Sequence, residues 1–139
     1  MARIVGLGGV FYKTSDPKAR KGWYVKHLGI SPGQGFDGVE MRWRRPDNPD
    51  HQEMSLVSFF DPDSDYLGKA GQPFMVNFVV EDIEGMVAKL KAEGCDVDEK
   101  IVDEGYGKFA WVTDPDGVRI EIWEPAGPMP NIGEMPSGD

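Results

Sequence analysis

Residues 111–125 read WVTDPDGVRIEIWEP and contain the signature of a β-hairpin. Pro115 occupies the second position of the DPDG segment and Gly117 the fourth, a composition that favours a type I turn. Apolar, strand-forming runs over 109–113 and 118–123 flank this turn. The stretch therefore predicts two adjacent antiparallel strands.

Glu121 lies in the middle of the second of these strands, between two isoleucines. Successive side chains of a strand point to opposite faces of a sheet. If Val118, Ile120 and Ile122 pack against a helix layer, the other face carries Arg119, Glu121 and Trp123. The alternation therefore predicts that Glu121 points away from the helices into a pocket. A pairing with Arg119 or a position at a wet rim remains open.

The chain repeats one plan. Residues 10–29, VFYKTSDPKARKGWYVKHLG, align with residues 76–94, VNFVVEDIEGMVAKLKAEG. Each segment begins as a strand, reaches an acidic N-cap at Asp16 or Asp82, and continues as a helix that closes on a glycine. In the second copy an apolar stripe recurs at the helical spacing over Ile83, Met86, Val87 and Leu90.

Strand signals follow each helix. In the first half they cover 39–44 and 54–60, on either side of a polar loop at 45–53, RPDNPDHQE. We expect one compact domain over 1–139, built of a first module at about 3–62 and a second at about 73–125. The tail 126–139 is rich in Pro and Gly, so we expect it to be irregular, either disordered or draped over a partner subunit.

Composition excludes some partners. The net charge of −9 argues against nucleic acid, whose binding proteins need a basic surface. No apolar run approaches the roughly 20 residues of a membrane span. The single Cys95 and a start that lacks signal-peptide features predict a cytoplasmic protein.

Three phrases resemble the vicinal oxygen chelate superfamily of glyoxalases, bleomycin-resistance proteins and extradiol dioxygenases. They are GWYVKHLGI (22–30), VVEDIEGMVAKLKAEG (79–94) and WVTDPDGVRIEIWEP (111–125). The resemblance covers about residues 3–125. It implies an α+β fold in which two βαβββ modules form an open, curved mixed sheet around a pocket, commonly at or near a dimer interface.

The resemblance also gives four positions where metal-dependent members carry ligands. In this sequence these positions are Gly9, Ser58, Met75 and Glu121. One carboxylate does not offset the dehydration of a divalent ion, and a thioether suits such ions poorly. We therefore expect no metal and no other cofactor. His27 and His51 are expected at the surface, and the glycines of GLGG (6–9) are expected to form a flexible strand start.

The remaining inward positions have the composition of a small-molecule site. We expect the ligand to contact Phe11, Ser58, Phe60, Asn77, Arg119, Glu121 and Trp123, with Leu56 nearby and with Trp43 and Tyr106 on faces that the sequence does not fix. A carboxylate beside indole rings suits a cationic or aromatic compound. The basic run RWRR (42–45) is either an anion site or a solvated strand edge.

These features predict a metal-free small-molecule binding protein, assembled as a homodimer. The alternative is a lyase or dioxygenase-like enzyme of the same superfamily, with a non-standard metal site or with Glu121 as general base. A third reading is an interaction module in which the barrel only scaffolds a dimer. The sequence leaves open whether the protein is catalytic.

Overall fold

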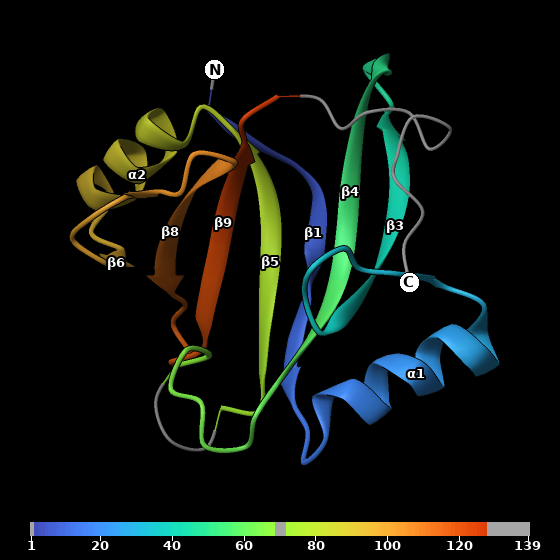
Figure 1. Cartoon of the computed structure of the whole chain (residues 1–139). Helices are drawn as coiled ribbons and strands as arrows, with labels where there is room; N and C mark the ends of the chain where they lie inside the picture. Colours follow the sequence, from blue (N-terminus) through green and yellow to red (C-terminus); the bar gives the residue numbers. More distant parts are fainter. Residues whose placement is uncertain (1, 69–71, 128–139) are drawn as a thin grey trace. The chain divides into compact units, whose positions relative to one another are not determined.

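The structure is a computed structural model that describes residues 2–68 and 72–127 (Figure 1). It divides into two compact units. Unit 1 contains residues 2–8 and 75–127, and unit 2 contains residues 9–74. Strand β1, Arg3–Lys13, belongs to both units because the division falls after Gly8.

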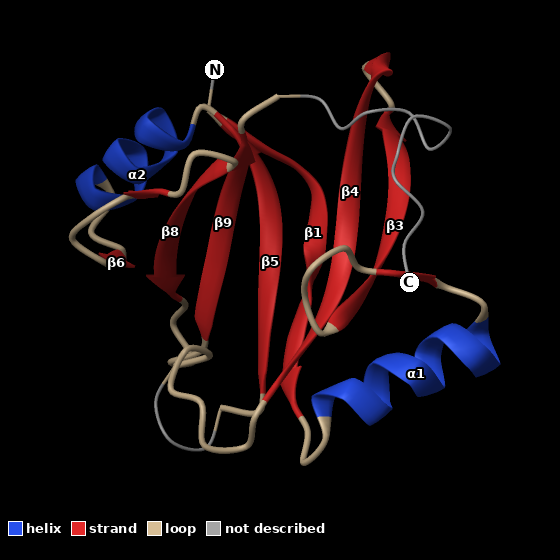
Figure 2. Cartoon of the chain, viewed as in Figure 1, coloured by secondary structure: helices blue, strands red, loops and turns tan. Residues whose placement is uncertain are grey.

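Each module has the order strand, helix, strands (Figure 2). After β1, the first module continues with α1 (Pro17–Leu28), β2 (Ser31–Pro32), β3 (Gly38–Arg45) and β4 (Asn48–Phe60). The second contains β5 (Phe74–Glu81), α2 (Ile83–Ala92), β6 (Asp96–Val97), β7 (Val102–Asp103), β8 (Gly107–Thr113) and β9 (Arg119–Pro125). The predicted α+β class with two βαβββ modules is confirmed; β7 is an additional short strand that pairs with β8. The prediction of one domain stays a prediction.

The two modules pair their strands in the same way. In unit 2 the order is β2-β3-β4-β1, and β1 runs parallel to β4. In unit 1 the order is β5-β9-β8-β6, and β5 runs parallel to β9. The first strand of each module therefore lies beside the last strand, so residues far apart in the sequence share one face.

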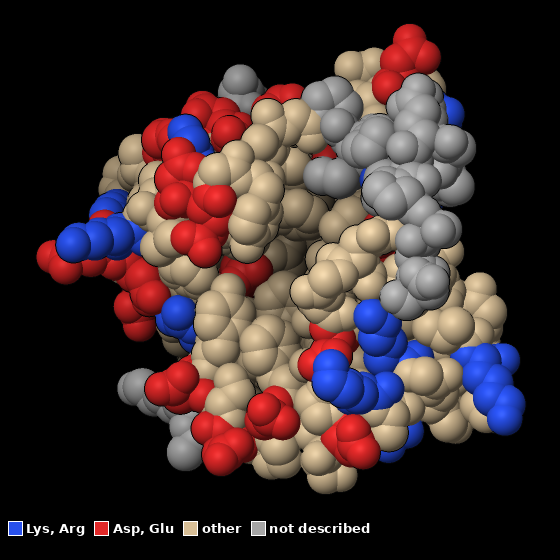
Figure 3. Space-filling view, in the orientation of Figure 1, with Lys and Arg blue, Asp and Glu red and all other residues tan. Residues whose placement is uncertain are grey.

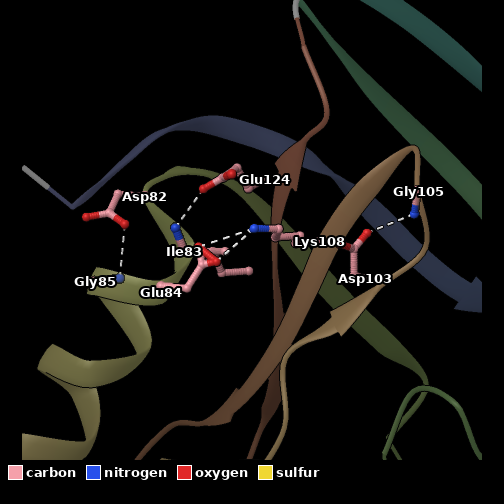
Figure 4. A network of polar contacts seen from close by, with 8 residues as sticks. All are labelled: Asp82, Ile83, Glu84, Gly85, Asp103, Gly105, Lys108 and Glu124. Carbon is pink, nitrogen blue, oxygen red and sulfur yellow. Dashed lines mark hydrogen bonds and ion pairs between the residues drawn. The ribbon is translucent and has the colours of Figure 1, made fainter.

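Both helices begin at the predicted caps. The Asp16 carboxylate accepts from Ala19 N at 3.1 Å, and α1 ends at Gly29, whose φ of 67° is left-handed. At α2, Asp82 accepts from Gly85 N at 3.1 Å, while Glu124 on β9 accepts from Ile83 N at 2.8 Å (Figure 4). Two carboxylates thus bond N–H groups that the first turn of α2 leaves unpaired.

The predicted stripe of α2 packs against unit 1's sheet. Ile83, Met86 and Val87 form one buried core with side chains of β5, β8 and β9, namely Val80, Ala110 and Ile122. The prediction that Ile122 faces the helix is confirmed. Val118 is exposed and precedes β9, so its predicted place in this layer is wrong.

In unit 2 the packing under α1 is aromatic. Tyr24 packs on Phe59 with ring centroids 5.0 Å apart, and its hydroxyl lies 3.0 Å from that of Tyr12. Burial, followed by the hydrogen bond to Tyr24, raises the pKa of Tyr12 to about 12. The outward surface around α1 is basic (Figure 3): the helix sequence PKARKGWYVKHL holds four Lys and Arg and no acidic residue.

The hairpin around DPDG has a specific geometry. Gly117 N donates to the Asp114 carbonyl at 2.9 Å, and Asp114 N donates to the Val118 carbonyl at 2.9 Å. Gly117 has φ 83°, which a glycine adopts without strain. A type I turn followed by a left-handed residue makes a three-residue loop with a bulge. This loop places Trp111 directly opposite Glu121.

The predicted polar loop at 45–53 is wrong. Strand β4 begins at Asn48, and β3 continues to Arg45, where the pairing register shifts. The hairpin extends because its end is held by side chains as well as by backbone: Arg45 and His51 both contact the Glu53 carboxylate, and Arg44 donates to the Pro49 carbonyl at 2.8 Å.

Gly8 and Gly9 of GLGG lie within β1 and are required there by close approach, so the prediction of a flexible strand start is wrong for these two residues. A Cβ on Gly8 would lie 1.8 Å from the Asn77 Oδ1 atom. A Cβ on Gly9 would lie 1.9 Å from the Leu56 carbonyl oxygen, and Gly9 also has φ 149°.

Within the described residues, no helix is both long and apolar enough to cross a membrane. The expectation of an irregular tail over 126–139 falls outside the described residues from 128 onward.

The glycine contacts give the first prediction. We expect Gly9→Ala to lower the free energy of unfolding by at least about 3 kcal/mol, because it adds backbone strain to overpacking. Gly22→Ala, in the exposed part of α1 with nothing within 4 Å, should raise it by about 0.5–1 kcal/mol. Urea unfolding measures the free energy of unfolding of both variants. If Gly9→Ala destabilised the protein no more than Gly22→Ala, the close packing around β1 would be contradicted.

Candidate functional site

The site is built around the carboxylate of Glu121 on β9. The residue is 1% exposed. Its Oε1 atom accepts from Asn77 Nδ2 at 2.6 Å, and its Oε2 atom accepts from Trp111 Nε1 at 2.9 Å. Because the donors come from β5 and β8, on either side of β9, the three strands together fix the direction of the carboxylate. The alternative of a solvated outer side chain is excluded.

The strand register explains why these groups meet. Asn77 is the Cα partner of Glu121 across β5 and β9, and Val79 is the partner of Trp123. Alternation then puts all of these side chains on the face of unit 1's sheet opposite α2. Met75, Asn77 and Val79 alternate along β5 with Phe78 and Val80, and the latter two pack in the α2 core.

Aromatic rings continue the same face along β9. Trp123 is buried and stacks in parallel on Phe109 of β8, with centroids 6.1 Å apart. Tyr106 meets the edge of Phe109 but is 65% exposed. Within the described residues, the buried Trp123 Nε1 and Asn77 Oδ1 atoms have no hydrogen-bond partner. This face therefore combines a fixed carboxylate with a wall of rings.

Arg119 lies at the start of the same strand. Its Nη1 atom is 2.9 Å from Asp98 Oδ2, and its guanidinium carbon lies 5.2 Å from the ring centroid of Trp111. The predicted pairing of Arg119 with Glu121 stays a prediction. Its predicted contact with a ligand stays a prediction.

In unit 2 three further predicted residues share the face opposite α1. Phe11 is the Cα partner of Ser58, and Phe60 follows two residues later on β4. The Phe11 and Phe60 rings lie 5.7 Å apart, and Tyr66 stacks on Phe60 at 5.5 Å. The structure thus groups Phe11, Ser58 and Phe60 in one cluster and Asn77, Arg119, Glu121 and Trp123 in another.

Several polar residues were missed by the sequence reasoning. On β3 the side chains of Glu40 and Arg42 are 8% and 7% exposed, and Arg42 Nη2 lies 3.0 Å from Glu40 Oε2. Glu53 is fully buried, and its Oε2 atom lies 2.8 Å from Arg45 Nη2 and 3.1 Å from His51 Nε2. The alternative of a solvated RWRR edge is therefore wrong for Arg42 and Arg45, whereas Arg44 is exposed. His51 is partly buried.

Trp43, whose face the sequence did not fix, donates its indole N–H to Ser55 Oγ at 2.9 Å. It is the cross-strand partner of Glu53, whereas Phe11 and Ser58 lie on the other face of the sheet. Trp111 is the residue that sequence reasoning should have found. The glycine at the fourth position of DPDG signals the bulged loop that sets Trp111 opposite Glu121.

The side chains at the four expected ligand positions fit a divalent metal poorly. In unit 1 they supply the Glu121 carboxylate, which already accepts two N–H bonds, and the buried thioether of Met75. Unit 2 supplies the hydroxyl of Ser58 and, at Gly9, no side chain. Among residues 2–68 and 72–127, no three His, Cys, Asp or Glu side chains are grouped as a metal site.

Together the repeated βαβββ modules and the Glu121 site define the class of fold. The model of the Glyoxalase/Bleomycin resistance protein/Dioxygenase superfamily matches residues 6–122. The chain belongs to this superfamily, as its motifs indicated. No curated protein matches the sequence.

Solved structures agree on the fold. Methylmalonyl-CoA epimerase from Mycobacterium tuberculosis is 23% identical, with 95% of this chain and 93% of that chain covered and a TM-score of 0.58. A variant of the Streptomyces coelicolor epimerase in complex with 2-nitronate-propionyl-CoA has 15% identity, coverage of 90% and 100%, and a TM-score of 0.65. A hypothetical protein from Bacillus halodurans C-125 has 15% identity, coverage of 94% and 99%, and a TM-score of 0.60. At these identities the likeness concerns the fold.

The contact between Asn77 and Glu121 gives the second prediction. Asn77→Asp sets two carboxylates within hydrogen-bonding distance, so we expect a loss of about 3 kcal/mol in the free energy of unfolding near pH 8. Stability should recover as the pH falls, because the pair then shares a proton and the repulsion disappears.

Asn48→Asp, at an exposed position of β4, is the matched control. It should change stability little and without this pH dependence. Urea unfolding at several pH values distinguishes the two, and an unaffected Asn77→Asp protein would contradict the site geometry.

Proposed function

We propose that the protein binds a small organic molecule, with Glu121 as the polar anchor and the neighbouring rings as the apolar wall. The observation that carries this proposal is the fixed, buried carboxylate of Glu121, held by one N–H donor from each flanking strand. A side chain oriented in advance loses little conformational freedom when a ligand binds, which favours affinity.

The chemistry of the site suggests the ligand's character. A carboxylate only accepts hydrogen bonds, as Glu121 does from Asn77 and Trp111. It therefore suits a ligand that carries an N–H donor or a protonated amine, since charge-assisted hydrogen bonds are the stronger kind. Trp123 and Phe109 offer ring surface for an aromatic or cationic group.

We propose that binding needs no metal. The donor set supports this: one carboxylate already bonded to two N–H groups, and a thioether that suits hard divalent ions poorly. We also propose that the protein is a cytoplasmic homodimer, because the pocket in this family commonly lies at or near a dimer interface. Light scattering in solution would give twice the 15.4 kDa chain mass if this is so, and the single mass if it is not.

The third prediction tests the anchor. In a thermal-shift screen of cationic and aromatic compounds, a ligand at about 100 times its dissociation constant should add about 2.7 kcal/mol of stability. Glu121→Gln should abolish the shift of any such compound, because it removes the charge but keeps the shape.

Glu93→Gln is the matched control, since this exposed carboxylate directly after α2 pairs with Lys89, one helical turn away. The control should keep the shift. Compounds that stabilise the wild-type and Glu121→Gln proteins equally would show that they bind elsewhere, and a screen without any shift would count against the proposal.

A second candidate is a lyase or dioxygenase-like enzyme, with a non-standard metal site or with Glu121 as a general base. It draws on the solved structures named as methylmalonyl-CoA epimerases, which share this fold, and on the fixed direction of the carboxylate. Elemental analysis of protein purified without chelator separates the candidates. A stoichiometric divalent ion, required for turnover of an acyl-CoA, would favour the enzyme.

A further inference from the structure

A chain of contacts leads from the surface of unit 1 to the buried Glu121 carboxylate. The Asp98 side chain is 42% exposed and lies 2.9 Å from Arg119 Nη1. The Arg119 guanidinium covers the ring of Trp111 at 5.2 Å, and the indole N–H of Trp111 donates to Glu121 Oε2 at 2.9 Å.

From this geometry we infer that Asp98 and Arg119 are positioning residues for Glu121: they hold the Trp111 indole at the angle from which it donates to the carboxylate. The inference rests on the proposed function, because it assigns these two residues to the site of Glu121.

The backbone supports the same arrangement. Asp98 N donates to the Trp111 carbonyl at 2.9 Å, so one residue holds Trp111 through its main chain and, by way of Arg119, through its ring. Arg119 pairs with Thr113 while Glu121 pairs with Trp111, so Arg119 and Trp111 are diagonal neighbours on one face of the β8–β9 ladder. Long side chains reach each other at this diagonal separation.

The arginine suits this task better than lysine. A guanidinium is planar, so it can stack on an indole while its edge donates to a carboxylate. A lysine ammonium keeps the charge but is a compact group that does not do both at once. Arg119→Lys therefore separates the effect of charge from that of position.

A comparable ion pair involves β8, the strand that carries Trp111. Lys108 of β8 lies 2.9 Å from Glu84 of α2, on the helix side of the sheet (Figure 4). The side-chain exposures of Lys108 and Glu84 are 38% and 54%, against 25% and 42% for Arg119 and Asp98. Glu84 raises the pKa of Lys108. Lys108→Gln thus removes a comparable surface ion pair that has no contact with Trp111.

The experiment uses the ligand-free protein. Its four tryptophans give four indole N–H signals in a ¹H–¹⁵N NMR spectrum, and Trp111→Phe identifies the signal of Trp111. In the wild-type protein we expect this signal to exchange slowly with solvent, because the indole N–H is held by the Glu121 carboxylate.

In Arg119→Lys and Asp98→Asn we expect the Trp111 signal to move toward the position of a free indole and its exchange to accelerate at least 10-fold. The other three indole signals and all four signals of Lys108→Gln should stay in place. Asp98→Asn replaces a partly exposed side chain, so it tests the inference even if Arg119→Lys fails to fold.

A Trp111 signal that moves no further in Asp98→Asn than in Lys108→Gln would overturn the inference. This result does not depend on any ligand. If instead no compound binds while the Trp111 signal responds as expected, the proposed function fails and the positioning role stands.

Discussion

The structure of the site depends on one interaction, the capture of the Glu121 carboxylate by N–H donors from both neighbouring strands. A carboxylate that leaves water without such donors destabilises a fold by several kcal/mol. Asn77 and Trp111 each donate to one oxygen, so the carboxyl group is tolerated at 1% exposure. The same two bonds tie β5, β9 and β8 together through side chains, in addition to the ladder of backbone bonds.

Much of this arrangement could be predicted from local patterns. Alternation along β9 put Glu121 and Trp123 on the face away from α2, and the helical spacing of Ile83, Met86 and Val87 gave the stripe that packs on the sheet. Both patterns work because a period of two and a period of 3.6 residues are properties of the backbone itself. The N-cap carboxylates of Asp16 and Asp82 could likewise be predicted from the few residues around them.

The remaining features depend on partners that no local pattern identifies. Trp111 is a donor to Glu121 because the turn, with its left-handed Gly117, sets the two residues directly opposite each other on β8 and β9. The loop expected at 45–53 forms strand because charged residues such as Arg45 and Glu53 pair across the hairpin, and a polar sequence alone predicts the opposite. The burial of the Glu40 and Arg42 pair likewise follows from the packing of β3, which composition does not encode.

The three-residue loop between β8 and β9 has a consequence for how such a chain can vary. Side chains of β9 alternate with a period of two, so inserting or deleting a single loop residue forces a choice between losing the ladder and turning the strand over. The second outcome would bury Glu121 among aliphatic side chains and present isoleucines where the carboxylate stood. Homologues should therefore tolerate exchanges within DPDG that keep its length and its final glycine, while changes in loop length should be rare and should coincide with a different chemistry in the neighbouring strand.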